Sequence, residues 1–536
     1  MFKKLFSGQI NSITTAAILV AFSSLMSRFL GIFRDRILAG QFGATNTLDM
    51  YYAAFRVPDF LYNLLILGAL SAGFIPIFTL IKEKAEEKEA WNFVSNILNI
   101  IAVFFIAVSA LGVIFALPLT KLIAPGFSPL DQRTTAALTR IMFLSPFFLG
   151  LSGVVGGVLQ TYKRFFVYSL APIFYNIGII IGALFFVPVW GIYGLAWGVV
   201  LGALMHMSVQ LPTLFGLGYK YSPRFNLKSK NVRHIVKIMI PRTMSLATTQ
   251  INLLVITIIA STLASGSLAI FNFASNLQTF PVGIFAISFA IAAFPTFSSF
   301  AFDKKKLVEN FSSSSRQILF FILPSMVLLY TLRAQIIRVV LGTGRFNWTD
   351  TILTMTALGY FSFSLFAQSL VPLLVRVFYA RHDSKTPFLI GLISDGSNVF
   401  LSFWLGHKMG VAGLALAFSI ANIIYFAILW IVLRAELGTL DELKIAFSTL
   451  KFAAAAAMSA GVIQVMKLAV LPFINMNKTW GVFMQGFIAG GVGILVYLLI
   501  CYILKSEELF NFARGIKRRM PWRKLEIPDQ GEARGI

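Results

Sequence analysis

Cysteine is nearly absent from this sequence, since Cys501 is the only one among 536 residues. A single thiol excludes an intramolecular disulfide and any metal centre built from several cysteines. Charge is also scarce: Asp, Glu, Lys and Arg make up 12% of the chain, whereas apolar residues make up 57%. A soluble domain of this length needs more charge to cover its surface. The composition, with a mean hydropathy of +0.81, therefore predicts a membrane protein.

Motifs for catalysis and for nucleotide binding are missing as well. The sequence has no glycine-rich phosphate loop between a strand and a helix, and its carboxylates do not form the pair that an interfacial glycosyltransferase or phosphatase needs. Four isolated histidines are present, none of them in a His-Glu-x-x-His pattern: His206, His234, His382 and His407. We expect no catalytic residue and no bound cofactor, and we retain a membrane enzyme only as an alternative.

Long apolar runs recur along the whole chain, and we interpret fourteen of them as transmembrane helices. They lie near residues 12–33, 50–80, 92–118, 136–159, 165–187, 191–216, 235–263, 267–299, 317–341, 351–379, 386–406, 410–433, 446–471 and 480–504. The predicted fold class is therefore an all-α polytopic membrane protein.

Basic residues are concentrated in the connections on the same side as the N-terminus. They include Lys82, Lys84, Lys88, several residues of 220–237, Lys304 to Lys306, and the tail residues Lys517, Arg518 and Arg519. The positive-inside rule then places both termini in the cytoplasm. This topology, with attraction to anionic membrane lipids, explains the net charge of +24 better than nucleic-acid binding does.

An internal repeat holds at one offset of 219 residues: Gly191–Ala196 matches Gly410–Ala415, and Ser145 matches Ser364. Pro76 with Pro295 and Phe127 with Phe346 match at the same offset. The offset covers six spans, an even number, so it predicts two parallel six-helix lobes followed by two further helices. The expected boundaries are 1–219 for the N-lobe, 220–438 for the C-lobe, 439–505 for the last two spans and 506–536 for a basic cytoplasmic tail. Such a duplication is typical of transporters, and a non-transporting scaffold is the alternative of another class.

Glycines at four-residue spacing occur within the spans, at Gly194, Gly198 and Gly202 and again at Gly486 and Gly490. Small residues at this spacing allow the backbones of two helices to approach closely. We interpret them as helix-packing positions.

Charged residues at membrane depth are costly, so they indicate function. The first two spans hold Arg28, Arg34, Asp35, Arg56 and Asp59. A guanidinium group binds a diphosphate through paired hydrogen bonds, which favours a cavity role for the arginines. The alternatives are pairing with nearby carboxylates, among them Asp49, or extension of the arginine side chains to the membrane surface, which applies above all to Arg34 and Arg36.

Fewer deep charges lie in the second lobe. Arg242 follows Pro241, and Arg376 stands near the end of a span. Asp395 lies on nearly the same helix face as Asn398, which is typical of a cation or proton site. A carboxylate hydrogen-bonded between helices is an equal alternative.

Several of these residues stand in motifs that closely resemble the MurJ (MviN) family. The resemblance rests on Ser27–Asp35, Phe42–Ala44, Asp49, Phe55–Asp59, Gln250–Ile251, Ala264–Ser267, Phe280–Gly283, Phe378–Pro387 and Gly410–Ala415. It covers spans 1 to 12 in order. It implies a fourteen-helix exporter fold of the multidrug/oligosaccharidyl-lipid/polysaccharide superfamily, with two lobes and a cationic central cavity.

The resemblance also implies the task of moving lipid II, an undecaprenyl-diphosphate-linked peptidoglycan precursor, from the inner to the outer leaflet by alternating access. Arg28 and Arg34 match the family's functional arginines, and Arg56 matches a basic position before the proline of span 2. With the neighbouring Ser27, Asp35 and Asp59, and with Asn276, they form the expected substrate site, and Arg242 compensates for missing arginines.

The sequence departs from the family pattern at two places. Tyr62 and Asn63 stand where an arginine pair is customary, and Ser275, Asn276 and Thr279 replace charged residues. These changes leave open a flippase for another polyprenyl-diphosphate-linked glycan, or a small-molecule exporter of the same superfamily. We expect a monomer that works without ATP and is driven by Na⁺, H⁺ or the membrane potential, with Asp395 and Asn398 as the candidate ion site.

Overall fold

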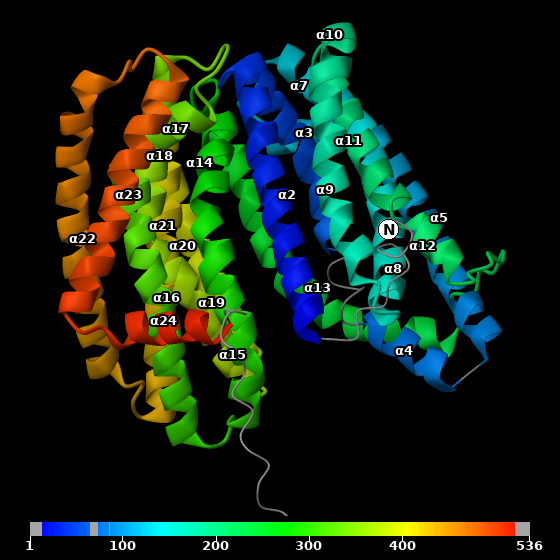
Figure 1. The fold of residues 1–536 in the computed structure, drawn as a ribbon. Helices are drawn as coiled ribbons and strands as arrows, with labels where there is room; N and C mark the ends of the chain where they lie inside the picture. The colour runs from blue at the N-terminus through cyan, green and yellow to red at the C-terminus, as the bar shows by residue number, and fades with distance from the viewer. Residues whose placement is uncertain (1–12, 65–72, 85, 520–536) are drawn as a thin grey trace, which may run out of the picture.

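The computed structural model describes residues 13–64, 73–84 and 86–519. Within these ranges every regular element is helical, as the composition predicted, and the helices form two bundles that face each other (Figure 1). Inside the described helices, the side chains of residues 13–18, 241–242, 244–246, 249 and 515–519 lie outside the description.

The first bundle contains the helices from α2 to α12. These are α2 (Ile13–Phe42), α3 (Asn46–Tyr62), α4 (Ile75–Lys84), α5 (Glu87–Ile114), α6 (Ala116–Ile123), α7 (Pro129–Met142), α8 (Leu144–Thr161), α9 (Phe165–Ile181), the π-helical turn η3 (Gly182–Phe186), α10 (Val187–Trp190), α11 (Ile192–Ser208) and α12 (Leu211–Gly216). We call this bundle the N-lobe.

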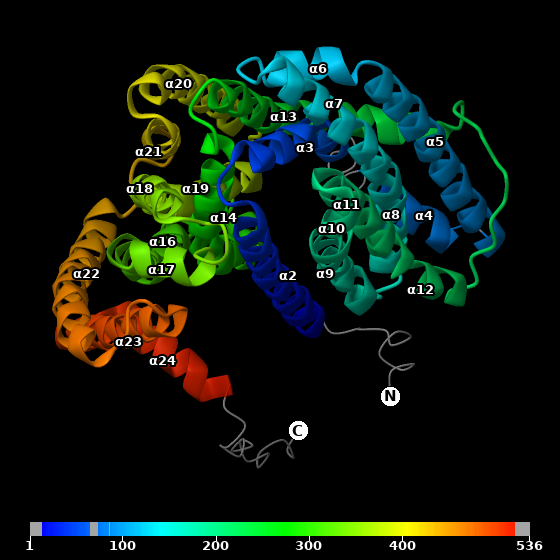
Figure 2. The same ribbon diagram turned by 90° about the horizontal axis from the view of Figure 1, so that it is seen from above.

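The second bundle, the C-lobe, begins after a long connection. It contains α13 (Lys230–Ser261), α14 (Ser267–Pro281), the π-helical turn η4 (Val282–Ala286), α15 (Ile287–Ser299), α16 (Lys304–Thr331), α17 (Arg333–Val340), α18 (Trp348–Ser362), α19 (Leu365–Ala380), α20 (Lys385–Met409) and α21 (Val411–Leu437). At its edge follow α22 (Glu442–Val470), the short 3₁₀ helix η5 (Leu471–Phe473), α23 (Thr479–Ile503) and α24 (Glu507–Arg519), as Figure 2 shows. The expected lobe boundaries fall in connections between these helices.

Ten helical segments of the described chain are long and apolar enough to cross a membrane, and an eleventh is formed by α18 and α19, which are bent by 45°. The protein is therefore a multi-pass membrane protein. The three expected spans outside this set lie near 12–33, 50–80 and 235–263, and each includes residues whose backbone or side chains lie outside the description. The count of fourteen stays a prediction.

The 219-residue repeat reappears in local geometry. Gly191 (φ 57°, ψ −141°) and Gly410 (φ 62°, ψ −142°) have the same backbone conformation at the start of α11 and α21. This positive-φ region favours glycine, because a side chain there is strained. Ser128 and Asn347, also 219 apart, cap the matching helices α7 and α18. Superposition of the complete lobes stays a prediction.

The glycines of α11 bring its backbone against α9. A β-carbon at Gly178 would lie 2.3 Å from the Cα of Gly202, and one at Gly182 would lie 2.3 Å from the Cα of Gly198. No side chain larger than hydrogen fits between these helices. The interpretation of the spaced glycines as packing positions is confirmed here.

The lobes share an apolar core at one end of the molecule. Leu38 and Leu48 of the N-lobe pack in the same buried cluster as Leu268 and Phe271 of the C-lobe. This is the end that carries the α2–α3 connection, and it lies opposite the first described residues of α2 and opposite α24 (Figure 1). We call it the far end and the opposite one the terminal end. Burial of apolar side chains from both lobes holds the far end closed.

Candidate functional site

A polar cavity of about 230 Å³ lies at the boundary between the lobes. It lies between α2 and α9 of the N-lobe and α14 of the C-lobe. Its polar lining residues are Ser27, Arg28, Arg34, Asp35, Asn176, Asn276 and Thr279. The structure thus brings together five of the eight residues expected to bind the substrate, namely Ser27, Arg28, Arg34, Asp35 and Asn276.

Asp35 is the centre of the hydrogen-bond network in this cavity. It is 3% exposed and forms an ion pair with Arg34, with 2.8 Å between Arg34 Nη2 and Asp35 Oδ1. The Asn276 side-chain amide donates to the other carboxylate oxygen at 2.7 Å. Because Asp35 belongs to α2 and Asn276 to α14, this carboxylate links the two lobes. A buried charge needs such partners to offset the loss of water.

Asn176 of α9 supports the same network from the N-lobe. Its side-chain oxygen accepts from Arg34 Nη1 at 3.2 Å, and its amide nitrogen donates to Ser27 Oγ at 3.2 Å. The side chain of Arg34 therefore has two fixed neighbours, and both constrain its direction. Asn176 was not among the residues predicted from the sequence, although a polar amide inside the apolar run 165–187 is a feature that could have identified it.

Arg28 differs from Arg34, because its side chain forms no hydrogen bond or ion pair in the described part of the chain. Its guanidinium group lies against η4, where a β-carbon on Gly283 would come within 2.5 Å of Arg28 Cζ. The absence of a side chain at Gly283 thus leaves room for this cation. Arg28 lines the cavity with its donors free, so it is available to an anion.

Arg56 does not line the 230 Å³ cavity. Its Nε donates to Thr257 Oγ1 at 2.9 Å and its Nη2 to Asn272 Oδ1 at 3.0 Å, so it links α3 to α13 and α14. Asp59, about one turn further along α3, does not line this cavity either. The side chain of Arg242 lies outside the described residues. The expected grouping of four arginines around one cavity therefore stays a prediction for Arg56 and Arg242.

A second polar cavity, of about 430 Å³, lies inside the C-lobe. Asp395 lines it and accepts a hydrogen bond from Asn252 Nδ2 at 2.6 Å. The Asn398 amide donates to Asn252 Oδ1 at 2.9 Å, so three polar side chains form a chain between α13 and α20. The described residues contain no group of three or more His, Cys, Asp or Glu side chains that could hold a metal ion. One carboxylate among amide oxygens matches the oxygen ligands of a hard monovalent cation, or the site of one proton.

The far end is closed by hydrogen bonds as well as by apolar packing. Asp49 of α3 accepts from the backbone N–H groups of Gly266, at 2.6 Å, and Ala269, at 2.8 Å, at the start of α14. Arg36 donates to the carbonyl groups of Val339 and Val340 at the end of α17. A carboxylate at a helix N-terminus and a cation at a helix C-terminus are both favourable. Arg36 and Asp49 therefore stabilise the contact between the lobes.

A protein family matches almost the whole chain. The family model described as "Lipid II flippase MurJ" matches residues 38–484. A probable lipid II flippase MurJ of Buchnera aphidicola subsp. Acyrthosiphon pisum (strain APS) is 31% identical over 423 residues, which are 76% of this chain and 81% of that protein. A probable lipid II flippase MurJ of Thermotoga maritima is 30% identical over 499 residues, which are 92% of this chain and 98% of that protein.

Solved structures share the fold. A structure described as "Lipid II flippase MurJ, inward closed conformation" matches with a TM-score of 0.75 and 26% identity, over 94% of this chain and 100% of that one. An inward-facing multidrug resistance MATE transporter of the MOP superfamily matches with a TM-score of 0.66 and 14% identity, over 79% of this chain and 98% of that one. The second match concerns the fold alone.

Proposed function

Because this chain belongs to the family of lipid II flippases named MurJ, we propose that it moves lipid II from the inner to the outer leaflet of a bacterial inner membrane. The protein is a transporter rather than an enzyme in this proposal, and it works by alternating access without ATP. Both termini lie in the cytoplasm, so the far end faces the periplasm. The protein acts as a monomer.

The observation that carries the proposal is the pair of arginines at the lobe boundary. Arg28 has no hydrogen-bond partner among the described residues, and Arg34 is held in place by Asp35 and Asn176. A diphosphate requires more than one cation when it leaves water, and a planar guanidinium group binds it through two hydrogen bonds. A cavity of about 230 Å³ can hold a small polar group such as a diphosphate but not a disaccharide-peptide. The sugar and peptide must therefore enter when the lobes separate.

The contacts at the far end support alternating access. Arg36 and Asp49 join the lobes there, and both bind backbone groups at the ends of helices in the other lobe. Such contacts can break and re-form without loss of a folded helix. In the proposed cycle they break when the terminal end closes, so that lipid II is released toward the periplasm.

Transport is coupled to Na⁺, H⁺ or the membrane potential in this proposal. Asp395, with Asn252 and Asn398, is the candidate ion site. Asn252 donates a hydrogen bond to one carboxylate oxygen of Asp395, and the second oxygen has no hydrogen-bond partner among the described residues. An ion or a proton here would change the link between α13 and α20. Because α13 also contacts α3 and α6 of the N-lobe, it would transmit this change to the lobe boundary.

The test is complementation of a bacterium in which the resident lipid II flippase can be depleted. Cells expressing this chain should grow, and leaflet-specific labelling should detect lipid II in the outer leaflet. Growth without outer-leaflet lipid II would contradict the proposal. Transport of a different polyprenyl-diphosphate-linked glycan, with lipid II left in the inner leaflet, would favour the other lipid-linked substrate.

A further inference from the structure

The last described helix, α24, runs across the C-lobe at the level of the middle of α16 instead of continuing along the direction of α23 (Figure 1). Its first turn is fixed to the lobe by charge: Glu508 is 4% exposed, pairs with Arg316 of α16 and accepts from Ser448 of α22 at 3.2 Å. Phe512 packs edge-on against Phe321 at a centroid distance of 5.1 Å. The helix is therefore a docked part of the fold.

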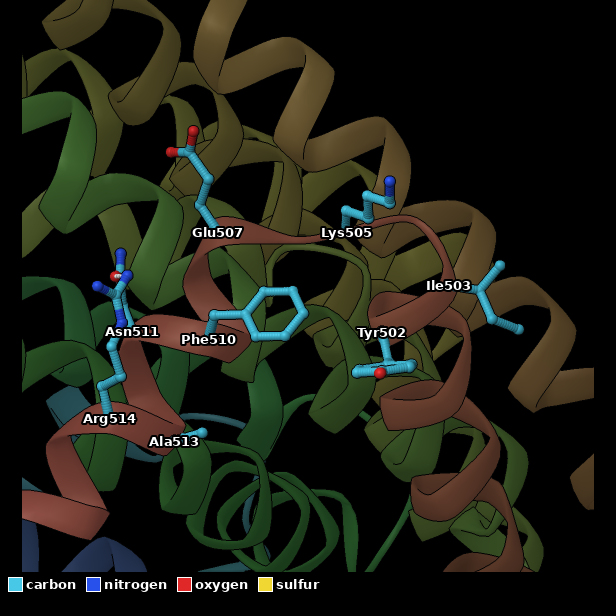
Figure 3. Close-up of a pocket in the computed structure, with 8 residues that line it drawn as sticks. All are labelled: Tyr502, Ile503, Lys505, Glu507, Phe510, Asn511, Ala513 and Arg514. Atoms are coloured by element: carbon cyan, nitrogen blue, oxygen red, sulfur yellow. Dashed lines mark hydrogen bonds between the residues drawn. The ribbon is translucent and has the colours of Figure 1, made fainter.

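A large open pocket lies in the bend between α23 and α24, with a volume of about 920 Å³. Figure 3 shows its lining residues around the bend. Three of them are large apolar or aromatic side chains that remain exposed: Tyr502 at 60%, Ile503 at 64% and Phe510 at 38%. The bend lies on the outer edge of the molecule (Figure 2), and Tyr502 of α23 packs against Phe510 of α24 with 5.7 Å between the ring centroids. Exposed apolar and aromatic side chains in such a place are suited to contact with lipid chains.

Charged groups at the same pocket favour an anion. Lys505 and Arg514 both line it, and neither forms an ion pair with a carboxylate in the described chain. Among the described residues, Arg514 donates to Asn511 alone, at 2.7 Å. Glu507 is the acidic residue among the described lining residues, and it is already engaged with Arg316 at 3.1 Å and with Lys444 at 3.9 Å. Within the described part of the chain, two cations thus remain without a counter-ion beside an apolar surface.

We propose that the pocket between α23 and α24 binds the headgroup of an anionic glycerophospholipid of the inner leaflet. Lys505 and Arg514, which lie on opposite sides of the pocket in Figure 3, supply the positive charge that attracts the headgroup, and Tyr502, Ile503 and Phe510 contact the acyl chains. The placement in the inner leaflet follows from the proposed topology with both termini in the cytoplasm. The site is separate from the cavity that contains Arg28, so lipid binding here does not require transport of lipid II.

The test compares retention of phosphatidylglycerol and phosphatidylcholine by the full-length protein, measured by native mass spectrometry from mixed micelles. The wild type should retain phosphatidylglycerol preferentially. Each basic residue near an anionic lipid contributes about a factor of five, so Lys505→Gln with Arg514→Gln should reduce this preference roughly twenty-fivefold. Both side chains are exposed, so the variant should remain folded.

The matched control is Lys478→Gln with Lys408→Gln, which removes two exposed lysines from the far end of the C-lobe. Lys478 precedes α23 as Lys505 follows it. The control should keep the wild-type preference. Equal retention of both lipids by the wild type would overturn the proposal, and so would an equal loss in the control and in the test variant. The pocket could instead bind a second copy of the chain. A dimer that forms in the wild type and in the control but not in the test variant would therefore also overturn the proposal.

Discussion

The guanidinium group of Arg28 on α2 lies over the backbone of Gly283 on η4, so close that a β-carbon at the glycine would approach Arg28 Cζ to 2.5 Å. This contact joins a cation of the N-lobe to a position in the C-lobe where any side chain would displace that cation. The flexible end of Arg28 can move aside, so Gly283→Ala should leave the fold intact and displace the cation. We expect normal expression with reduced lipid II flipping in proteoliposomes.

Gly491→Ala is the control for this prediction, because nothing lies within 4 Å of a β-carbon at Gly491 in α23. It should have wild-type activity. Full activity of Gly283→Ala would show that the position of Arg28 against η4 is unimportant.

Removal of the Arg28 side chain should affect binding more strongly. Loss of one bidentate contact to a diphosphate costs about 1.5–3 kcal/mol, or roughly ten- to a hundredfold in affinity. Arg28→Ala should therefore cripple flipping without loss of the folded protein, and Arg28→Lys should restore it only in part, since an ammonium group lacks the planar fork. Flipping assays and lipid II binding measure both effects. An alanine variant with full activity would refute the diphosphate model.

Asn176 should position Arg34 and so contribute to affinity indirectly. Asn176→Ala removes hydrogen bonds to Arg34 and Ser27, and we expect the Kd for lipid II to rise roughly fivefold, since one hydrogen bond is worth about 1 kcal/mol. Ser169→Ala is the control, because it removes a different hydrogen bond between α9 and α2, to Ser23. The same loss of affinity in both variants would indicate a general role of α9 packing instead.

Asp49 should hold the far end closed. Asp49→Asn replaces two charge-assisted hydrogen bonds to the start of α14 with weaker ones, and it should raise the population of molecules open at that end. Cys501 is buried, so a Thr279→Cys reporter in the cavity can be labelled selectively. A membrane-impermeant reagent added on the periplasmic side should label this cysteine faster in the Asp49→Asn variant than in the protein with Asp49. An unchanged rate would assign Asp49 a purely structural role.

Asp395→Asn tests the coupling site. The substitution removes the charge but keeps a group that can hydrogen bond to Asn252, so the protein should fold and lose the dependence of flipping on an imposed Na⁺ or H⁺ gradient. Ser397→Ala, on the same helix, should keep that dependence. If flipping by Asp395→Asn depends on the gradient as much as flipping by the wild type does, the carboxylate serves only as a hydrogen-bond acceptor between helices.

The helical fold could be predicted because an apolar run is a pattern within one segment, and the shared conformation of Gly191 and Gly410 follows from matches at one offset. Arg28, Arg34 and Asp35 could be selected as candidates for a similar reason, since a charge within an apolar run is conspicuous. The hydrogen bonds of Arg56 to Thr257 and Asn272 could not be predicted, because they depend on the packing of α3 against two distant helices. Gly283 belongs to a motif of the family resemblance, but only its distance to Arg28 shows which side chain it accommodates.

The glycine contact between α9 and α11 has a mechanical consequence. Because the two backbones touch without intervening side chains, α9 and α11 cannot slide past each other and move as one rigid unit. Asn176 attaches α2 to this rigid unit through its hydrogen bonds to Arg34 and Ser27. When the N-lobe rocks, α2, α9 and α11 must therefore turn as one piece. These helices move against α14 and η4 of the C-lobe, where Asn276 contacts Asp35 and Gly283 lies against Arg28.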